Sequence, residues 1–490
     1  MRWHIAAAGL MGLFAQSATA IPMDIDNDQS VKDAAATIAF GMMSYYTGNN
    51  TGDTPGNLPD PYYWWEAGAM FGALVDYWWI TGDTSYVEAT SQAIIHQASP
   101  TRDFMPANQS RTSSNDDVGF WTLTAMTAAE DAFPDPPEDQ PQWLALVQAV
   151  FNQMASRWDD LNCGGGLRWA INDFQTGKDY KNSISNGLFF NLGSRLSRFT
   201  GNSTYGEWAT RTWDWERSLG LITDDYEVRD GAHFNVTTHE CHEDSGPHVW
   251  SYNVGVFLQG AAFMYNVSEG AERETWKTRV DGLLGAIEAK FVTNDTNIVR
   301  EWYCESGFTD RGRPYQCNID QQTFKGYLLR WLSSTSQVAP YTYDRIMAWI
   351  RPTAIGAAAA CTGPVGSAAP QVDSGGIQPG FRGIDGTACG FKWTEPFDGW
   401  AGVGAQMNAL SAVMYTLTHR GLAGGKAAKG PVTTAQGGTS KGDPSAGSTD
   451  HSSRGLAALK PITTADRVGA GIVTAILAIS IIGGSVFLTI

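Results

Sequence analysis

Residues 62–80 read YYWWEAGAMFGALVDYWWI, and residues 81–86, which follow them, read TGDTSY. The first stretch is almost wholly apolar, as is typical of a helix buried on every side. The second contains glycine, aspartate and serine, which favour turns. A more polar, amphipathic helix then runs to about Gln97. The pattern predicts a helical hairpin whose first helix is buried and whose second helix faces solvent.

The same hairpin pattern recurs along the chain. A second unit spans residues 186–218 with its turn at 200–205, and a third spans residues 253–291 with its turn at 266–270. We expect further apolar helices at 117–133, 323–333 and 400–419, with polar companions at 142–158, 343–350 and 30–46. Six inner and six outer helices predict an all-α fold, an (α/α)6 barrel that forms one domain over residues 21–421.

The inner helices begin alike, because a polar or aromatic residue precedes a glycine by one or two positions. The residues concerned are Glu66, Asp117, Asn186, Asn253, Lys325 and Trp400. Glycine disfavours a helix interior by about 1 kcal/mol, so its recurrence indicates either close helix packing or close approach of a ligand. If all six helices open on one rim, these side chains surround one cavity, beside long loops at 161–185 and 294–320.

Two adjacent carboxylates, Asp116 and Asp117, stand where the loop 113–115 turns into an apolar helix. One interpretation is structural, because Ser114 is a good N-cap and acidic residues in a first turn complement the helix dipole. The other is a catalytic pair, because a retaining glycosidase needs two carboxyl groups about 5–5.5 Å apart. The helix N-terminus favours the ionised form of one, while like-charge repulsion raises the pKa of its neighbour.

Other side chains have both a functional and a structural interpretation. Tryptophans can stack on sugars or fill the core, and the candidates are Trp65, Trp121, Trp169 and Trp400. A cluster of His239, Cys241, His242 and His248 could hold a metal, but Cys241 is expected in a disulfide. Glycosidase chemistry with two carboxylates needs no metal, so we expect no metal and no other cofactor.

Composition and the chain ends indicate the compartment. The 490 residues carry a formal net charge of −17, which argues against a nucleic-acid partner. Residues 1–20 are typical of a signal peptide. Residues 422–467 are rich in Gly, Ser and Thr, and the charge-free run 468–490 completes a GPI-anchor signal, the alternative being a membrane-spanning tail. We expect a secreted protein at the outer face of the plasma membrane, held by lipid alone.

Six cysteines in a secreted chain predict three disulfides. Closeness in sequence favours Cys304–Cys317 and Cys361–Cys389, which leaves Cys163 with Cys241. Glycosylation sequons, which we expect on the surface, begin at Asn49, Asn108, Asn202, Asn235, Asn266 and Asn294.

Several motifs together resemble glycoside hydrolase family 76, the α-1,6-mannanases, and most closely its fungal GPI-anchored cell-wall branch. The matching segments are Tyr63–Gly68, Asn115–Asp117, Gly164–Trp169, Lys181–Gly187, Tyr252–Gly255 and Phe324–Gly326. The resemblance implies an (α/α)6 barrel and retaining chemistry on α-1,6-mannosides, with Asp116 as nucleophile and Asp117 as acid/base. Asn115 joins the substrate-binding candidates through its motif.

The same resemblance implies partners for the reaction. The fungal branch is thought to act on the mannose-containing glycan of GPI anchors and to transfer proteins to wall β-glucan, which would make glucan the acceptor. We expect a monomer. Two other classes stay open: another barrel enzyme, such as an inverting glycosidase with carboxylates 6.5–9.5 Å apart or a lyase, and a non-catalytic mannan-binding wall protein.

Overall fold

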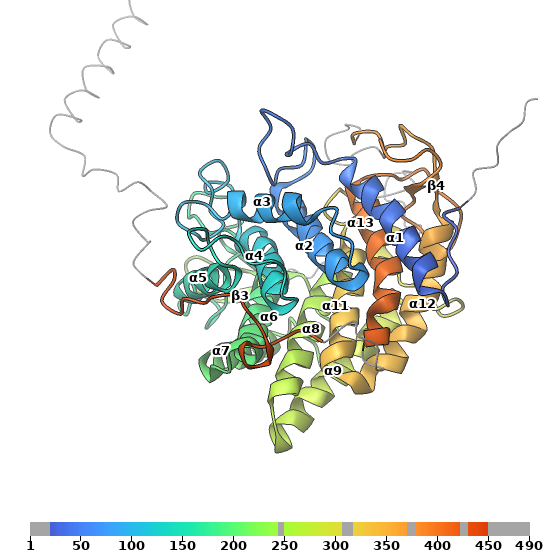
Figure 1. The fold of residues 1–490 in the computed structure, drawn as a ribbon. Helices are drawn as coiled ribbons and strands as arrows, with labels where there is room; N and C mark the ends of the chain where they lie inside the picture. Colours follow the sequence, from blue (N-terminus) through green and yellow to red (C-terminus); the bar gives the residue numbers. More distant parts are fainter. Residues whose placement is uncertain (1–19, 244–248, 306–316, 370–377, 422–429, 449–490) are drawn as a thin grey trace, which may run out of the picture.

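The computed structural model describes residues 20–243, 249–305, 317–369, 378–421 and 430–448. Six helices form an inner ring, in which each helix contacts the next and the last contacts the first. They are α2 (Trp64–Thr81), α4 (Asn115–Glu130), α6 (Ser183–Thr200), α8 (Ser251–Val267), α11 (Phe324–Val338) and α13 (Val403–Met414). The closed ring confirms the predicted barrel (Figure 1).

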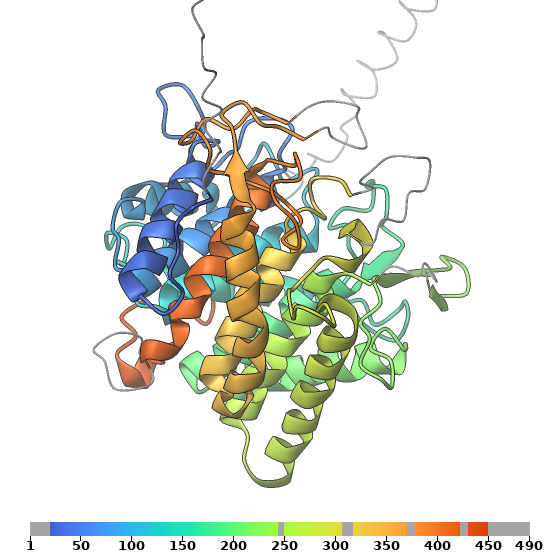
Figure 2. The same ribbon diagram turned by 90° about the vertical axis from the view of Figure 1, so that its right-hand side faces the viewer.

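Six outer helices pack against this ring, as the alternation of apolar and amphipathic stretches predicts. They are α1 (Asp28–Met43), α3 (Val87–Gln97), α5 (Trp143–Ser156), α7 (Ser203–Ser218), α9 (Gly270–Phe291) and α12 (Tyr343–Ala359). Burial separates the two layers, since every residue of α4 except Asp117 is buried, whereas most of α9 is not. Figure 2 shows α12 and α9 running along the outside of the barrel.

The largest differences from the predicted helix bounds are at the ends of α11, α12 and α13. The inner helix α11 continues to Val338 rather than ending at residue 333, and the outer helix α12 continues to Ala359, past Pro352, rather than ending at residue 350. Burial of Thr353, Ala354, Ala357 and Ala358 beyond the proline offsets the lost backbone bond. The last inner helix begins only at Val403 and passes into a 3-10 helix at Tyr415–Gly421, so residues 400–419 are not one α-helix.

Little β-structure accompanies the helices in the described part of the chain. Strands β1 (Tyr180–Asn182), β2 (Gly231–Phe234) and β3 (Cys241–Glu243) form a small antiparallel sheet above the barrel rim. Strands β4 (Cys361–Gly363) and β5 (Ala388–Cys389) form a second one. A short helix, α10 (Trp302–Glu305), lies in the loop after α9.

The covalent predictions are confirmed where the structure tests them. The disulfides are Cys163–Cys241, Cys304–Cys317 and Cys361–Cys389, so all six cysteines are paired as expected. All six sequon asparagines are exposed. Residues 1–19 of the predicted signal peptide and the apolar terminal run fall outside the described residues. Among the described residues no helix is long and apolar enough to cross a membrane.

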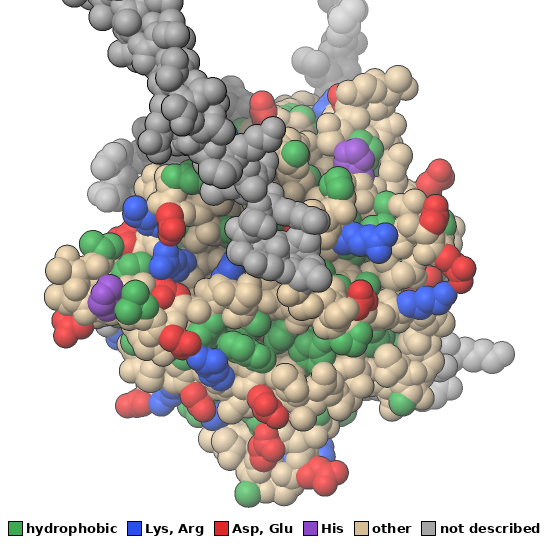
Figure 3. All heavy atoms as spheres, turned by 90° about the vertical axis from the view of Figure 1, so that its left-hand side faces the viewer, with side chains coloured by type: hydrophobic (Ala, Val, Ile, Leu, Met, Phe, Trp, Pro, Cys, Tyr) green, Lys and Arg blue, Asp and Glu red, His purple; other side chains and the backbone are tan. Residues whose placement is uncertain are grey.

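Residues 430–448, here called the C-terminal strap, lie within the segment 422–467 that is rich in Gly, Ser and Thr. Backbone and side-chain bonds tie the strap to α4 and α5: Val432 N donates to Glu130 O (2.8 Å), Leu144 N to Ser440 Oγ (3.0 Å), and Asn152 Nδ2 to Ala446 O (2.8 Å). The strap therefore lies along the outside of the barrel, at the side that Figure 3 shows. Acidic and basic side chains are interspersed among the coloured residues of that face.

Because these bonds join the strap to the barrel, we expect the strap to stabilise it. We compare a chain ending at residue 421 with a chain ending at residue 448, which keeps the strap. The free energy of unfolding of the shorter chain should be lower by on the order of 2 kcal/mol. Urea unfolding of the two proteins measures the difference. Coincident unfolding curves would mean that the strap contributes nothing to stability.

Candidate active site

A cavity of about 300 Å³ opens at the rim where the inner helices begin. Its walls come from the first turns of α2, α4, α8 and α11 and from the loops that precede the inner helices. The lining residues are Trp65, Asp116, Asp117, Phe120, Trp169, Tyr180, Asn182, Asp230, Trp250, Tyr252, Asp320, Gln321 and Phe324. Four carboxylates and seven aromatic rings thus surround a space large enough for a short sugar chain.

The Asp pair stands in the first turn of α4, and it both caps the helix and lines the cavity. Asp117 Oδ2 accepts a hydrogen bond from Ser114 N (2.8 Å), so the predicted cap exists. Asp116 Oδ1 accepts from Ser114 Oγ and from Asp117 N (3.0 Å), and its Oδ2 accepts from Asn182 Nδ2 (2.9 Å). The structural and the functional interpretation are therefore compatible.

The two carboxyl groups differ in their surroundings. Burial raises the pKa of Asp117 to about 8, and the nearby charge of Asp116 adds to that rise. Burial also raises the pKa of Asp116, but hydrogen bonds from Ser114, Asn182 and the backbone stabilise its ionised form and oppose the rise. The pair titrates together, with Asp117 better suited to hold the proton and Asp116 better suited to stay ionised.

Two further carboxylates face the same cavity. Asp320 accepts a hydrogen bond from Trp65 Nε1 (3.1 Å), and its charge helps to raise the pKa of Asp117. Asp230 accepts from Tyr180 Oη (2.9 Å) and Asn253 Nδ2 (3.1 Å). The described lining holds no lysine or arginine, so the cavity favours neutral or cationic ligands over anions.

The structure places Trp65 and Trp169 of the predicted substrate-binding residues in the cavity wall. Glu66, Asn115, Trp121, Asn186, Asn253, Lys325 and Trp400 do not line it. All seven are buried, because the inner-helix starts pack against each other just below the opening.

Several of these seven hold the wall in place instead. Asn115 Nδ2 donates to Arg168 O (2.8 Å), Asn186 Oδ1 accepts from Leu167 N (2.7 Å), and Asn253 bonds to Asp230. Glu66 Oε2 accepts from Tyr63 N (2.9 Å) at the start of α2, and Lys325 pairs with Glu305 (2.9 Å). Trp121 packs on Trp64 and Trp400 on Phe391, so both are core residues.

The recurrent glycines likewise serve helix packing. A Cβ added to Gly68 would lie 2.8 Å from the ring of Trp121, and one added to Gly255 would lie 2.7 Å from Trp331. Neither glycine touches the cavity. Close helix packing, rather than close ligand approach, therefore explains the repeated motif.

Sequence reasoning missed most of the lining. Tyr180, Asn182, Asp230, Trp250, Tyr252, Asp320, Gln321, Phe324 and Phe120 were not among the candidates. Asn182 and Tyr252 lie within the motifs that carry the family resemblance, and Trp250, Asp320 and Gln321 stand within four residues of an inner helix. For Trp250, Asp320 and Gln321, the signal available in the sequence was their position just before a predicted inner helix.

The histidine and cysteine cluster is part of the loop architecture. Cys241 is bonded to Cys163, and His239 Nδ1 lies 2.8 Å from Asn162 Oδ1. The described residues contain no group of three His, Cys, Asp or Glu that could hold a metal ion. His248 lies outside them.

Comparison with known proteins decides the family. The sequence profile described as glycosyl hydrolase family 76 matches residues 30–433. This chain belongs to glycosyl hydrolase family 76. It is therefore a glycoside hydrolase, as the motifs predicted.

Relatives within family 76 cover almost the whole chain. The mannan endo-1,6-alpha-mannosidase DCW1 of Saccharomyces cerevisiae is 41% identical over 490 residues, 98% of both chains. The structure of Dfg5 from Chaetomium thermophilum in complex with glucosamine is 40% identical, with a TM-score of 0.76 over 89% of this chain and 98% of that one. The α-1,6-mannanase from Salegentibacter sp. HEL1_6, bound as an inactive variant to α-1,6-mannotriose, shares the fold at 14% identity, with a TM-score of 0.57 over 79% of this chain and 99% of that one.

Proposed function

We propose that this chain is a retaining endo-1,6-α-mannosidase with transglycosylase activity, in which Asp116 is the nucleophile and Asp117 the acid/base. The observation that carries the proposal is the pair itself. Both carboxyl groups line one cavity from one helix turn, and their environments favour opposite protonation states. The names of the fungal relatives, mannan endo-1,6-alpha-mannosidases, support the choice of substrate.

The reaction follows from these two environments. Asp117 donates its proton to the glycosidic oxygen while Asp116 attacks the anomeric carbon, which gives a covalent glycosyl-enzyme and a free leaving sugar. Asp117, now ionised, takes a proton from the incoming hydroxyl group as that oxygen attacks and releases Asp116. Water as the incoming group gives hydrolysis, and a sugar hydroxyl gives transfer.

We propose the mannoside of a GPI anchor as donor and a β-glucan as acceptor, for a protein held at the outer face of the plasma membrane. Two features favour this donor. The cavity holds four carboxylates and, among the lining residues described, no cation. The Chaetomium relative was crystallised with glucosamine, an amino sugar that is cationic at neutral pH. Release of the protein from membranes by a phosphatidylinositol-specific phospholipase tests the anchor.

Product analysis with defined α-1,6-mannosides, with and without β-glucan oligosaccharides, tests the activity. We expect internal cleavage with retained anomeric configuration, and mixed mannose–glucose products when glucan is present. Inverted products would indicate an inverting enzyme. Binding of mannoside with no turnover under any condition would indicate a wall-binding protein.

The pH dependence follows from the same two groups. Activity should fall at high pH around the pKa of Asp117, about 8, because the acid loses its proton. It should fall at low pH as Asp116 becomes protonated. A bell-shaped profile of kcat/KM against pH checks this, and a profile flat between pH 5 and 9 would contradict it.

A further inference from the structure

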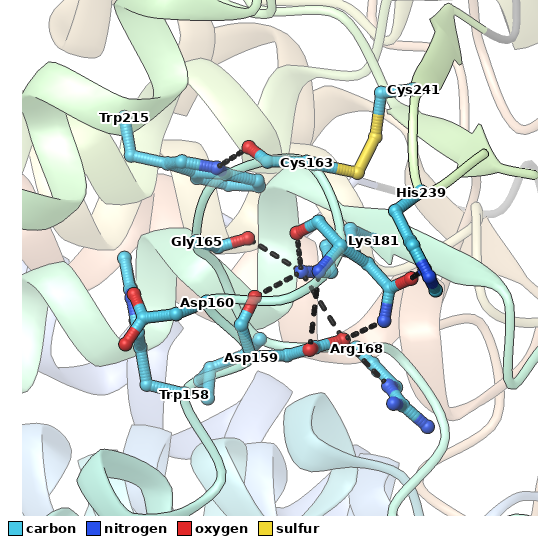
Figure 4. A network of polar contacts seen from close by, with 12 residues as sticks. Trp158, Asp159, Asp160, Cys163, Gly165, Arg168, Lys181, Trp215, His239 and Cys241 are labelled. Atoms are coloured by element: carbon cyan, nitrogen blue, oxygen red, sulfur yellow. Dashed lines mark hydrogen bonds and ion pairs between the residues drawn. A yellow bond between two sulfur atoms is a disulfide. The ribbon is translucent and has the colours of Figure 1, made fainter. Parts of the chain in front are cut away.

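Lys181 is a buried cation that no step of the proposed reaction uses. Its side chain is 0% exposed and lies at the centre of the network in Figure 4. Its Nζ donates to the backbone carbonyls of Asp159 (2.9 Å), Asn162 (2.6 Å) and Gly165 (2.5 Å), and lies 3.4 Å from Asp159 Oδ2. The three protons of an ammonium group match these three acceptors.

The three carbonyls belong to one loop, in which Asn162 O also accepts a hydrogen bond from Gly165 N (3.3 Å). Gly164, Gly165 and Gly166 all have positive φ angles, of 64°, 145° and 89°, which turn the backbone back on itself. A Cβ on Gly166 would lie 2.3 Å from Trp215, so the loop is packed against that ring. Lys181 is therefore the shared partner that holds the loop in this shape.

The loop leads directly to the catalytic pair. Its exit, residues 167–170, pairs with the residues just before the aspartates: Asn115 N donates to Trp169 O (2.9 Å), and Ser114 forms a bridge with Ala170. Trp169 N in turn donates to Tyr180 O (2.7 Å) in β1. A shift of the loop would therefore move both the start of α4 and the Trp169 side of the cavity.

A second connection is shorter. Asn182 follows Lys181 in β1, and its Nδ2 donates to Asp116 Oδ2 (2.9 Å). This bond is among those that oppose the rise in the pKa of Asp116. Asn182 is also the N-cap of α6 and pairs with Gly231 in β2, so Lys181 is one of the anchors that fix its position relative to the carboxylate.

We propose that Lys181 is a positioning residue for the reaction: by binding the 159–165 carbonyls it holds Asn182 against Asp116 and Trp169 in the cavity wall. It does not line the cavity and touches no reacting atom. The proposal rests on the assignment of Asp116 as nucleophile. When Lys181 is changed, Asp159 keeps Arg168 as a partner (2.9 Å) and Asn162 O keeps Gly165 N (3.3 Å). The loss of the ammonium therefore removes the shared donor of the loop without leaving an isolated charge.

Lys181→Met tests the proposal in the full-length protein. We expect kcat/KM to fall about 10²-fold in a folded enzyme, since small displacements of catalytic groups cost that much. The acid limb of the pH profile should move up by about one unit, because a displaced Asn182 no longer favours ionised Asp116. The other titratable groups that line the cavity are unchanged in this variant, namely Asp117, Asp230, Asp320, Tyr180 and Tyr252, so a shift of this limb reports on Asp116.

Arg195→Met is the matched control. Arg195 is also a buried cation, 3% exposed, but it binds Glu130 (2.5 Å) near the opposite end of α6, away from the cavity. We expect this variant to lose stability and keep the acid limb of the wild type. A folded Lys181→Met protein with an unmoved limb, or an equal shift in Arg195→Met, would overturn the proposal.

Two further measurements separate the possible failures. The first measurement combines Lys181→Arg, which keeps the charge, with Asn182→Ala. If Lys181 acts on Asp116 through Asn182, the acid limb of the double variant should shift by less than the sum of the two single shifts. Additive shifts would refute a route through Asn182. The carboxyl ¹³C resonance of Asp116, assigned by its absence in Asp116→Asn, should titrate at higher pH in Lys181→Arg, and it reports on positioning without turnover. If wild-type protein cleaves no α-1,6-mannoside, the proposed function fails while this titration still decides the role of Lys181.

Discussion

Replacing Asp116 with Asn is expected to lower turnover of α-1,6-mannosides by at least about 10³-fold while the protein stays folded. The amide cannot attack the anomeric carbon, so no glycosyl-enzyme forms with any donor. Asn keeps an acceptor oxygen for the hydrogen bonds from Ser114 Oγ and Asp117 N, and the cap of α4 is formed by Ser114 and Asp117, so α4 should survive the change. Steady-state kinetics and mass spectrometry of the intact enzyme with a slow donor measure both effects.

A buried aspartate at the other end of the same helix provides the control for this experiment. Asp131 is buried just after α4, where burial and the nearby charge of Asp76 raise its pKa well above the usual range, and it does not line the cavity. Asp131→Asn should therefore change turnover little. If Asp116→Asn is folded and retains near-normal turnover, the pair is only a helix cap and the glycosidase mechanism proposed here is wrong.

Replacing Asp117 with Asn should produce a loss that depends on the leaving group. Without the general acid, glycosides with poor leaving groups should react about 10²–10⁴-fold more slowly, which is the usual contribution of general acid catalysis. An activated donor, such as an aryl mannoside, should retain most of the rate of glycosyl-enzyme formation, since its leaving group needs no proton. The alkaline limb of the pH profile should also disappear. Equal losses for both donors would contradict the role of acid.

The same variant should be more stable than the wild type at neutral pH. The pKa of Asp117 is about 8 in the folded protein, above its ordinary value of 3.8, so the folded state binds the proton more tightly than the unfolded state. Stability of the wild type is therefore lost as pH rises from about 4 to about 8. Asn has no proton to lose, so the excess stability of Asp117→Asn should grow over that window, by about 1 kcal/mol or more. Urea unfolding at pH 5 and pH 8 measures it.

The chain by itself determined the barrel, because each inner helix is apolar on every side and each outer helix on one side only. The hairpin at 62–97 needs no information from elsewhere to be recognised, since burial of a whole helix leaves a local pattern. The proposed catalytic pair was equally accessible, because two adjacent carboxylates at a helix start form a local motif. The disulfides followed from spacing and an even count of cysteines.

Only the tertiary structure decided what surrounds the pair. Asp230 and Asp320 are more than a hundred residues from Asp116 and reach the cavity through loops whose course no local pattern encodes. Asn253 and Lys325 stand at the predicted rim, yet both are buried beneath it. Periodicity fixes which helices are buried, whereas a side chain's depth and direction at a helix end depend on packing against neighbours distant in sequence.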